Sequence, residues 1–149
     1  TSVQDAGRWD HGGDTVLGSE IDYTPISSSS KIIYEISFFF YASTTTNICV
    51  NLEQSTDSGV SWSRIADRFG RNVGWAQSDP GSVSGQEYRF FSHFSFIIPA
   101  WSGERSLRLR FRQAPQYWNW DAQLHKNYVW DGAAASNKFT NTSVLVHEI

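Results

Sequence analysis

Hydrophobic and polar residues alternate with a period of two along most of this chain, as in β-strands that have one buried face. In segment 106–113, Leu107, Leu109 and Phe111 fall on one face and three arginines fall on the other. In segment 31–41, one face is wholly apolar or aromatic, whereas the other mixes apolar side chains with Glu35 and Ser37. We therefore expect one face of 31–41 to meet the core and the other to meet a neighbour. Similar alternation predicts strands in 47–53, 87–98 and 142–149.

Turn-forming residues separate these segments, and nothing in the pattern is typical of a helix. They cluster at 27–30, 56–59, 78–85, 100–103 and 131–136. Short strands at spacings of roughly 8–12 residues, with turns between them, are typical of β-sandwiches and jelly rolls. The sequence predicts an all-β, jelly-roll β-sandwich of two antiparallel sheets at 21–149. Residues 1–20, rich in Gly and Asp, are expected to form a lead-in arm from a longer chain.

Composition and charge narrow the classes of function. The 149 residues suffice for one domain, and the net charge of −3 comes without any basic run. Nucleic acid and anionic membrane surfaces are therefore unexpected partners, and no apolar stretch is long enough for membrane insertion. The single Cys49 excludes an internal disulfide. Ten Phe, seven Trp and six Tyr exceed the needs of one core, which places some rings at the surface or at a subunit interface.

The sharpest local motif is STDSGVSW at 55–62, which resembles the Asp-box S-x-D-x-G-x-T-W. Its residues predict a hairpin turn in which the Asp57 carboxylate accepts local N–H groups, Gly59 has positive φ and Trp62 packs back under the turn. Asp-boxes recur in sialidase-like propellers, but this chain has one copy and is too short for a propeller. The motif therefore predicts a structural turn rather than a glycosidase site.

Other catalytic and metal-binding patterns are weak. The loop aspartates, among them Asp67, Asp121 and Asp131, show no pairing of the kind that glycoside hydrolysis requires. The four histidines lack metal-ligand spacing, and no G-x-S-x-G elbow is present. We expect no enzyme activity, no metal and no cofactor.

The richest mixture of aromatic and polar residues lies in QYWNWD at 116–121 and in Trp130-Asp131. Saccharide sites use such mixtures, because a ring stacks on the sugar while amide and carboxylate groups fix its hydroxyls. Alternatively, Trp118 and Trp120 pack into the core or across a subunit contact. Segment 64–75 is a second candidate surface. The candidate ligand-binding residues are Tyr117, Trp118, Asn119, Trp120, Asp121, Trp130, Asp131, Arg68 and Trp75.

A stripe of arginines, Arg108, Arg110 and Arg112, lies on the polar face of 106–113. Such a stripe is usually solvated. Alternatively, it pairs with Glu35 or Glu53 across a sheet or a subunit interface.

Two stretches resemble one family. Residues 21–36, IDYTPISSSSKIIYEI, resemble the ITYTPKSASSKILIEV segment in C-terminal domains of bacteriophage tail fibres and tail spikes. Residues 142–149, TSVLVHEI, resemble the S-x-L-x-V-x-E-I strand with which such chains often end. Ile26 replaces the usual Lys, and His147 stands where Met is frequent. The resemblance implies a jelly-roll receptor-binding head, assembled as a homotrimer at the tip of a fibre.

The expected function is therefore host attachment through a cell-surface saccharide, either polysaccharide or lipopolysaccharide. The resemblance places the protein in the virion, at the tail-fibre tip, after synthesis in the host cytoplasm. Three alternatives stay open: a trimerisation or capsid-decoration module, a monomeric carbohydrate-binding module of an enzyme, and a depolymerase.

Overall fold

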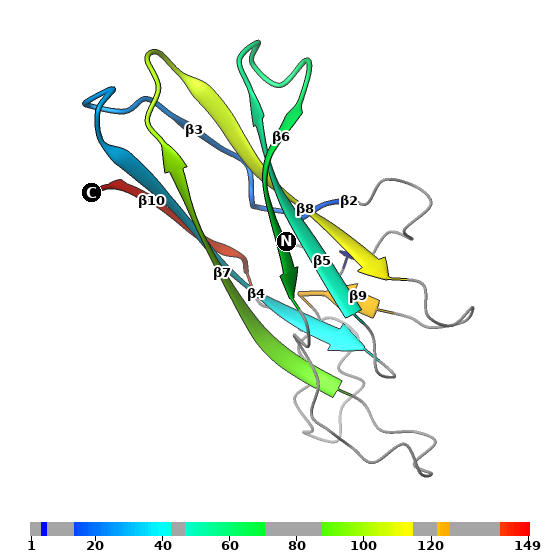
Figure 1. Ribbon diagram of the computed structural model, residues 1–149. Coiled ribbons are helices and arrows are strands. Elements are labelled where there is room, and N and C mark those ends of the chain that lie inside the picture. Colours follow the sequence, from blue (N-terminus) through cyan, green and yellow to red (C-terminus); the bar gives the residue numbers. More distant parts are fainter. Residues whose placement is uncertain (1–3, 6–13, 43–46, 71–87, 115–121, 126–140) are drawn as a thin grey trace.

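Two antiparallel sheets packed face to face make up the described part of the molecule (Figure 1). The computed structural model describes residues 4–5, 14–42, 47–70, 88–114, 122–125 and 141–149. No helix occurs in these ranges. The prediction of an all-β fold with two antiparallel sheets is confirmed.

The first sheet is built around β4 (Lys31–Ala42), and we call it the β4 sheet. Along one edge β4 pairs over its whole length with β7 (Tyr88–Pro99). Its other edge is shared: β10 (Ser143–Glu148) pairs with its first half, and β9 (Ala122–Leu124) with its end. The two-residue β1 (Gln4–Asp5) pairs with β9.

The second sheet is built around β5 (Asn47–Ser55), and we call it the β5 sheet. On its two sides lie β8 (Arg105–Ala114) and β6 (Ser63–Gly70). The outer edge of β8 is shared by β3 (Ile21–Tyr23) and β2 (Asp14–Thr15). A β-bulge between Leu52 and Glu53 shifts the β5–β6 register, so that Ile65 and Ala66 both pack against the core.

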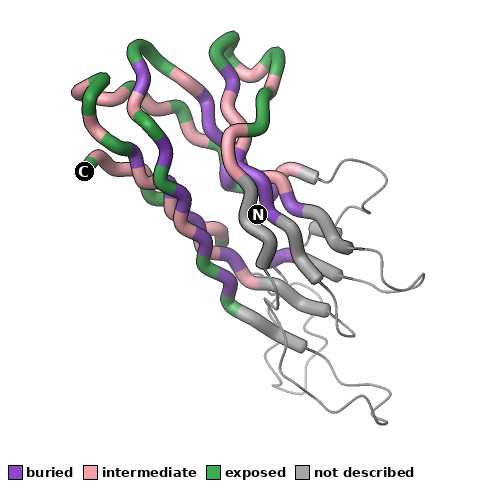
Figure 2. The backbone as a smooth tube through the Cα atoms, viewed as in Figure 1, coloured by how far each residue is buried: buried purple, intermediate pink, exposed green. Residues whose placement is uncertain are grey.

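The core lies between the sheets and follows the alternation read from the sequence. Buried and more exposed residues alternate along β4 and β7 (Figure 2). Tyr34 is fully buried, and its hydroxyl donates to the carbonyl of Ser19 at 2.6 Å. Burial raises the pKa of Tyr34, so the ring stays neutral. The predicted inward residues of the described strands are confirmed: Ile32, Tyr34, Ile36, Phe38, Val50, Leu52, Phe94, Phe96, Ile98, Leu107, Leu109 and Phe111.

Part of the expected lead-in arm is integrated in the sandwich. Residues 14–15 form β2 against β8, and Val16 and Ser19 are completely buried. The Ser19 hydroxyl donates to the carbonyl of Leu109 at 3.3 Å and accepts from its N–H at 3.1 Å. Between β2 and β3, where β8 has no strand partner, Ser19 thus supplies hydrogen bonds to Leu109. Gly18, with φ of 79°, forms the bend before it.

Candidate functional site

The predicted ligand-binding residues lie almost entirely outside the described residues. Arg68 has a described backbone, in β6 opposite Val50, but its side chain falls outside. The others are Tyr117, Trp118, Asn119, Trp120, Asp121, Trp130, Asp131 and Trp75.

The strands that border these segments do have described positions. Ala42 lies opposite Tyr88, and Asn47 lies opposite Ala114. Gly70, at the end of β6, lies opposite Ile48. Segments 43–46, 71–87 and 115–121 are therefore all bordered by strand ends at one end of the sandwich, the lower end in Figure 1. Trp75 and residues 117–121 belong to two of these three segments.

The opposite end carries the Asp-box hairpin that joins β5 to β6. The Ser55 hydroxyl accepts from the N–H of Gly59 at 2.8 Å and donates to the Asp57 carboxylate at 2.6 Å. Asp57 also accepts from the backbone N–H of Ser61 at 2.8 Å and from the Ser61 hydroxyl. Gly59 has φ of 83°, and the Trp62 ring N–H donates to its carbonyl at 2.9 Å. The predicted structural turn is confirmed.

Hydrogen bonding dominates the electrostatics of this hairpin. Bonds from the hydroxyls of Ser55 and Ser61, and from the Ser61 N–H, lower the pKa of Asp57 to about 2. The carboxylate is thus saturated by local donors, and Ser61 supplies the same hydroxyl as the Thr that is usual in the motif. A carboxylate held in this way organises the turn.

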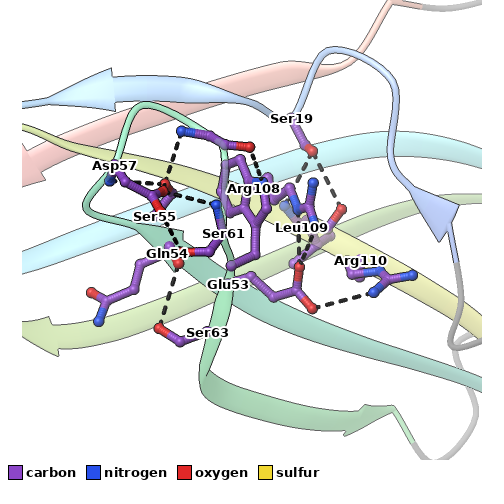
Figure 3. A network of polar contacts seen from close by, with 12 residues as sticks. Ser19, Glu53, Gln54, Ser55, Asp57, Ser61, Ser63, Arg108, Leu109 and Arg110 are labelled. Atoms are coloured by element: carbon purple, nitrogen blue, oxygen red, sulfur yellow. Dashed lines mark hydrogen bonds and ion pairs between the residues drawn. The ribbon is translucent and has the colours of Figure 1, made fainter.

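Beside the hairpin, the outer face of the β5 sheet carries a closed polar network (Figure 3). Arg108 donates from Nε to Glu53 at 2.9 Å, and its Nη2 lies 2.8 Å from the same carboxylate. Arg110 reaches Glu53 at 3.6 Å. The Arg108 guanidinium stacks on the Trp62 ring, 3.9 Å from the ring centroid. Within the arginine stripe, pairing with Glu53 is therefore observed for Arg108 and Arg110, whereas Glu35 lies in the other sheet. The side chain of Arg112 lies outside the described residues.

The outer face of the β4 sheet is different, because it exposes apolar side chains. Phe91 and Ile97 of β7 are 64% and 59% exposed, and Leu145 of β10 is 54% exposed. Ile97 lies directly opposite the half-buried Ile33, and Phe91 opposite the half-buried Phe39. We call these five residues the outer apolar patch.

A serine, a histidine and a glutamate lie together within this face. The Ser37 hydroxyl is 2.9 Å from Nδ1 of His93, and Nε2 of His93 is 3.9 Å from Glu35. A nucleophilic serine also needs free N–H donors for the oxyanion. β4 pairs with β7 on one edge and with β10 on the other, so its backbone donors beside Ser37 are used in the ladders. The arrangement suits a polar contact within a surface.

The two stretches that resemble tail-fibre domains meet at one corner of the sandwich. Lys31 and Ile149 exchange both backbone hydrogen bonds, at 2.9 and 3.1 Å. The Glu148 carboxylate accepts from the backbone N–H of Ile26 and, at 3.4 Å, from the Tyr23 hydroxyl. The terminal strand thus lies against the turn at 24–30. The Glu148 carboxylate joins the two, because it accepts hydrogen bonds from Tyr23 and Ile26. Sequence reasoning did not anticipate this role for Glu148, since its partners are more than 120 residues away.

His125 is a second residue that the sequence did not single out. It follows β9, has φ of 67° and is completely buried. Its backbone N–H donates to the carbonyl of Phe39 at 2.6 Å. Burial lowers the pKa of its ring below the usual 6.5. Within the described residues, no three His, Cys, Asp or Glu side chains gather closely enough to hold a metal ion. The part of the chain that the structure describes also has no helix long and apolar enough to cross a membrane.

Comparison of the chain with protein-family models, with curated proteins and with solved structures gives no match. Function is therefore inferred from the residues and surfaces described above.

Proposed function

We propose that this chain is the receptor-binding head of a bacteriophage tail fibre or tail spike, a homotrimer that attaches the virion to a host-surface saccharide. The proposal takes the sandwich to be a jelly roll and takes the protein to work by binding rather than by catalysis. Its site of action is the fibre tip of the assembled virion, after synthesis in the host cytoplasm.

The observation that carries the proposal is the pairing of the two resembling stretches. Residues 21–36 and 142–149 are far apart in sequence, yet they share a strand ladder and the Glu148 hydrogen bonds. A resemblance found separately in two stretches thus falls on one structural unit. Such agreement favours a shared fold over two chance matches.

The positions of the strand ends support a binding role. Trp75 and the QYWNWD run belong to segments bordered by one end of the sandwich, away from the resembling corner. Sandwich proteins commonly carry their recognition loops at one end of a rigid scaffold. The aromatic and polar residues of these segments suit stacking on sugar rings and hydrogen bonding to hydroxyls.

The test is adsorption of the full chain to a panel of bacterial cells and to surface polysaccharide and lipopolysaccharide extracted from them. We expect binding to one strain or a few, and no release of reducing ends. Trp118→Ala and Trp120→Ala should abolish adsorption while the mass in solution stays unchanged. Val60→Ala, in the hairpin at the opposite end, is the control and should bind normally. Absence of binding to cells and to every extract would refute the receptor role.

A structural module for trimerisation or capsid decoration is the second candidate, and the outer apolar patch favours it. In that case Trp118→Ala and Trp120→Ala would dissociate the oligomer rather than abolish adsorption alone. A monomeric carbohydrate-binding module is the third candidate, and light scattering separates it because its mass would equal that of one chain at every concentration.

A further inference from the structure

We infer that the outer face of β7, β4 and β10 is the surface through which copies of this chain associate. The inference deepens the homotrimer of the proposed function, and rests on it, by assigning the face where one copy meets a second. It does not depend on what the protein binds.

The first observation is where the exposed apolar side chains gather. Of the exposed large hydrophobic residues, Phe91, Ile97 and Leu145 lie on this face, and Ile149 follows β10 at the same outward parity. Cross-strand pairing joins Ile97 to Ile33 and Phe91 to Phe39, and Leu145 lies opposite Glu35, so the apolar residues are spread over three neighbouring strands. Polar residues, among them Ser37 and His93, lie between the two apolar pairs. Exposed apolar side chains that gather on one face beside polar residues mark an interaction site.

The edge of the same sheet is a second and independent observation. Within the described residues, β7 pairs with β4 alone, which leaves its other edge open over twelve residues. Its sequence YRFFSHFSFIIP has Pro only at the end and one Arg near the start. Proteins normally protect so long and apolar an edge with charges, with an internal proline or by covering it. A second copy of the chain would cover this edge in the assembly.

Charge and size favour a second copy as the occupant. The formal charges whose side chains are described on this face are Lys31 and Glu35, which cancel, so copies of the face can gather around a three-fold axis without net repulsion. Strand spacing and rise give three strands of this length a face on the order of 500 Å². Each partner of a standard interface buries about 800 Å², so the face supplies most of one.

The chemistry of the patch argues against a saccharide here. Ile33, Ile97 and Leu145 are aliphatic and offer sugar hydroxyls no hydrogen bonds. The polar side chains beside the Phe39–Phe91 pair, Ser37 and His93, lie within 2.9 Å of one another, so they already have a partner within the face. Small-molecule sites are concave and combine apolar walls with converging polar groups, whereas this surface is the open outer side of a sheet. Protein surfaces with an apolar centre fit it better.

The experiment is light scattering of the full chain over a dilution series, with Ile97→Thr/Leu145→Thr as the variant. Threonine is β-branched, as strands favour, and removes apolar contact area at both positions. Val60→Thr makes a similar change at a residue that is 84% exposed in the Asp-box hairpin, and serves as the matched control. We expect wild type and the control to show a multiple of the chain mass. The double variant should dissociate at concentrations at least about tenfold higher for each substitution.

The outcomes separate this inference from the proposed function. If wild type is oligomeric and the double variant keeps the same dissociation profile, the face is not the interface, although the homotrimer and the receptor role stand. If wild type is monomeric at every concentration, both the inference and the homotrimer fail. If the double variant does not fold, Ser143→Arg replaces it. That change adds a charge to the exposed end of the same face without removing any core contact, and an unchanged mass for it would also overturn the inference.

Discussion

The outer faces of the two sheets differ in how far their side chains are shielded from water. On the β5 sheet, Glu53 and Arg108 are only 12% and 18% exposed, and Trp62 lies over the guanidinium. On the β4 sheet, the corresponding outward positions carry Phe91, Ile97 and Leu145, which are more than half exposed. We call the outer face of the β5 sheet the closed face, because side chains of the same chain cover its charges. We call the outer face of the β4 sheet the open face, because its apolar side chains are exposed.

The difference shows that strand alternation does not determine what an outer face does. A polar outer face can be largely withdrawn from water when its charges pair and an aromatic ring covers them. An apolar outer face can stay exposed when a neighbour covers it in the assembly. Four measurements of unfolding stability test this difference between the two faces.

The largest effect is expected from removing the carboxylate that holds the closed face together. Glu53→Ala removes the carboxylate that Arg108 contacts at 2.8 Å and leaves this half-buried guanidinium without its counter-charge, so it should lower the free energy of unfolding by about 2–3 kcal/mol. Glu35→Ala, on the open face, should change it by less than about 0.5 kcal/mol. Urea unfolding of both variants, at the same low protein concentration, measures the two changes in the free energy of unfolding. Equal effects would mean that the two faces do not differ in this way.

A smaller contrast is expected from two serine hydroxyls. Ser55 is buried and makes three hydrogen bonds in the hairpin, whereas the Ser37 hydroxyl makes one exposed bond to His93. Ser55→Ala should cost about 1–2 kcal/mol, and Ser37→Ala less than about 0.5 kcal/mol. Thermal unfolding provides the comparison, and a larger loss from Ser37→Ala would contradict it.

The aromatic cover should contribute less again. Trp62→Phe keeps a ring near Arg108 but removes the 2.9 Å hydrogen bond to the Gly59 carbonyl. We expect a loss of about 1 kcal/mol. A double-mutant cycle of Trp62→Ala with Arg108→Ala measures the coupling between the two side chains, and a coupling energy of zero would show that Trp62 does not stabilise the arginine.

Acid should weaken the Asp-box hairpin beside the closed face. The folded pKa of Asp57 is about 2, below its ordinary 3.8, so its contribution to stability is complete above pH 3.8 and declines as the pH falls toward 2. Asp57→Asn should remove this part of the acid dependence. Unfolding midpoints measured between these two pH values test the expectation, and an unchanged slope in the variant would refute it.

Sequence reasoning was most successful where local chemistry determines structure. The period-two pattern predicted β4, β5, β7, β8 and β10 to within a few residues, because a strand side chain either faces the core or does not. The Asp-box turn was predicted in its Asp57 acceptor, its positive-φ Gly59 and its Trp62 packing, since all of its partners lie within eight residues. The hydrogen bonds of the Ser55 hydroxyl were not predicted. For the ligand-binding residues the sequence supplies residue types without positions, and Arg68 alone reaches the described strands.

By itself, the sequence determined the fold class, the inward residues and the hairpin, because each depends on neighbours a few residues apart. The tertiary structure alone decided that Arg108 and Arg110 pair with Glu53 and that Ser19 hydrogen-bonds to β8 between β2 and β3. Only the tertiary structure shows that Glu148 lies against the turn at 24–30 and that the outer apolar patch lies on the outer face of the β4 sheet. These contacts join residues from 55 to more than 120 positions apart. Such pairs meet only after the sheets have packed, and alternation along a single strand carries no information about which strands become neighbours.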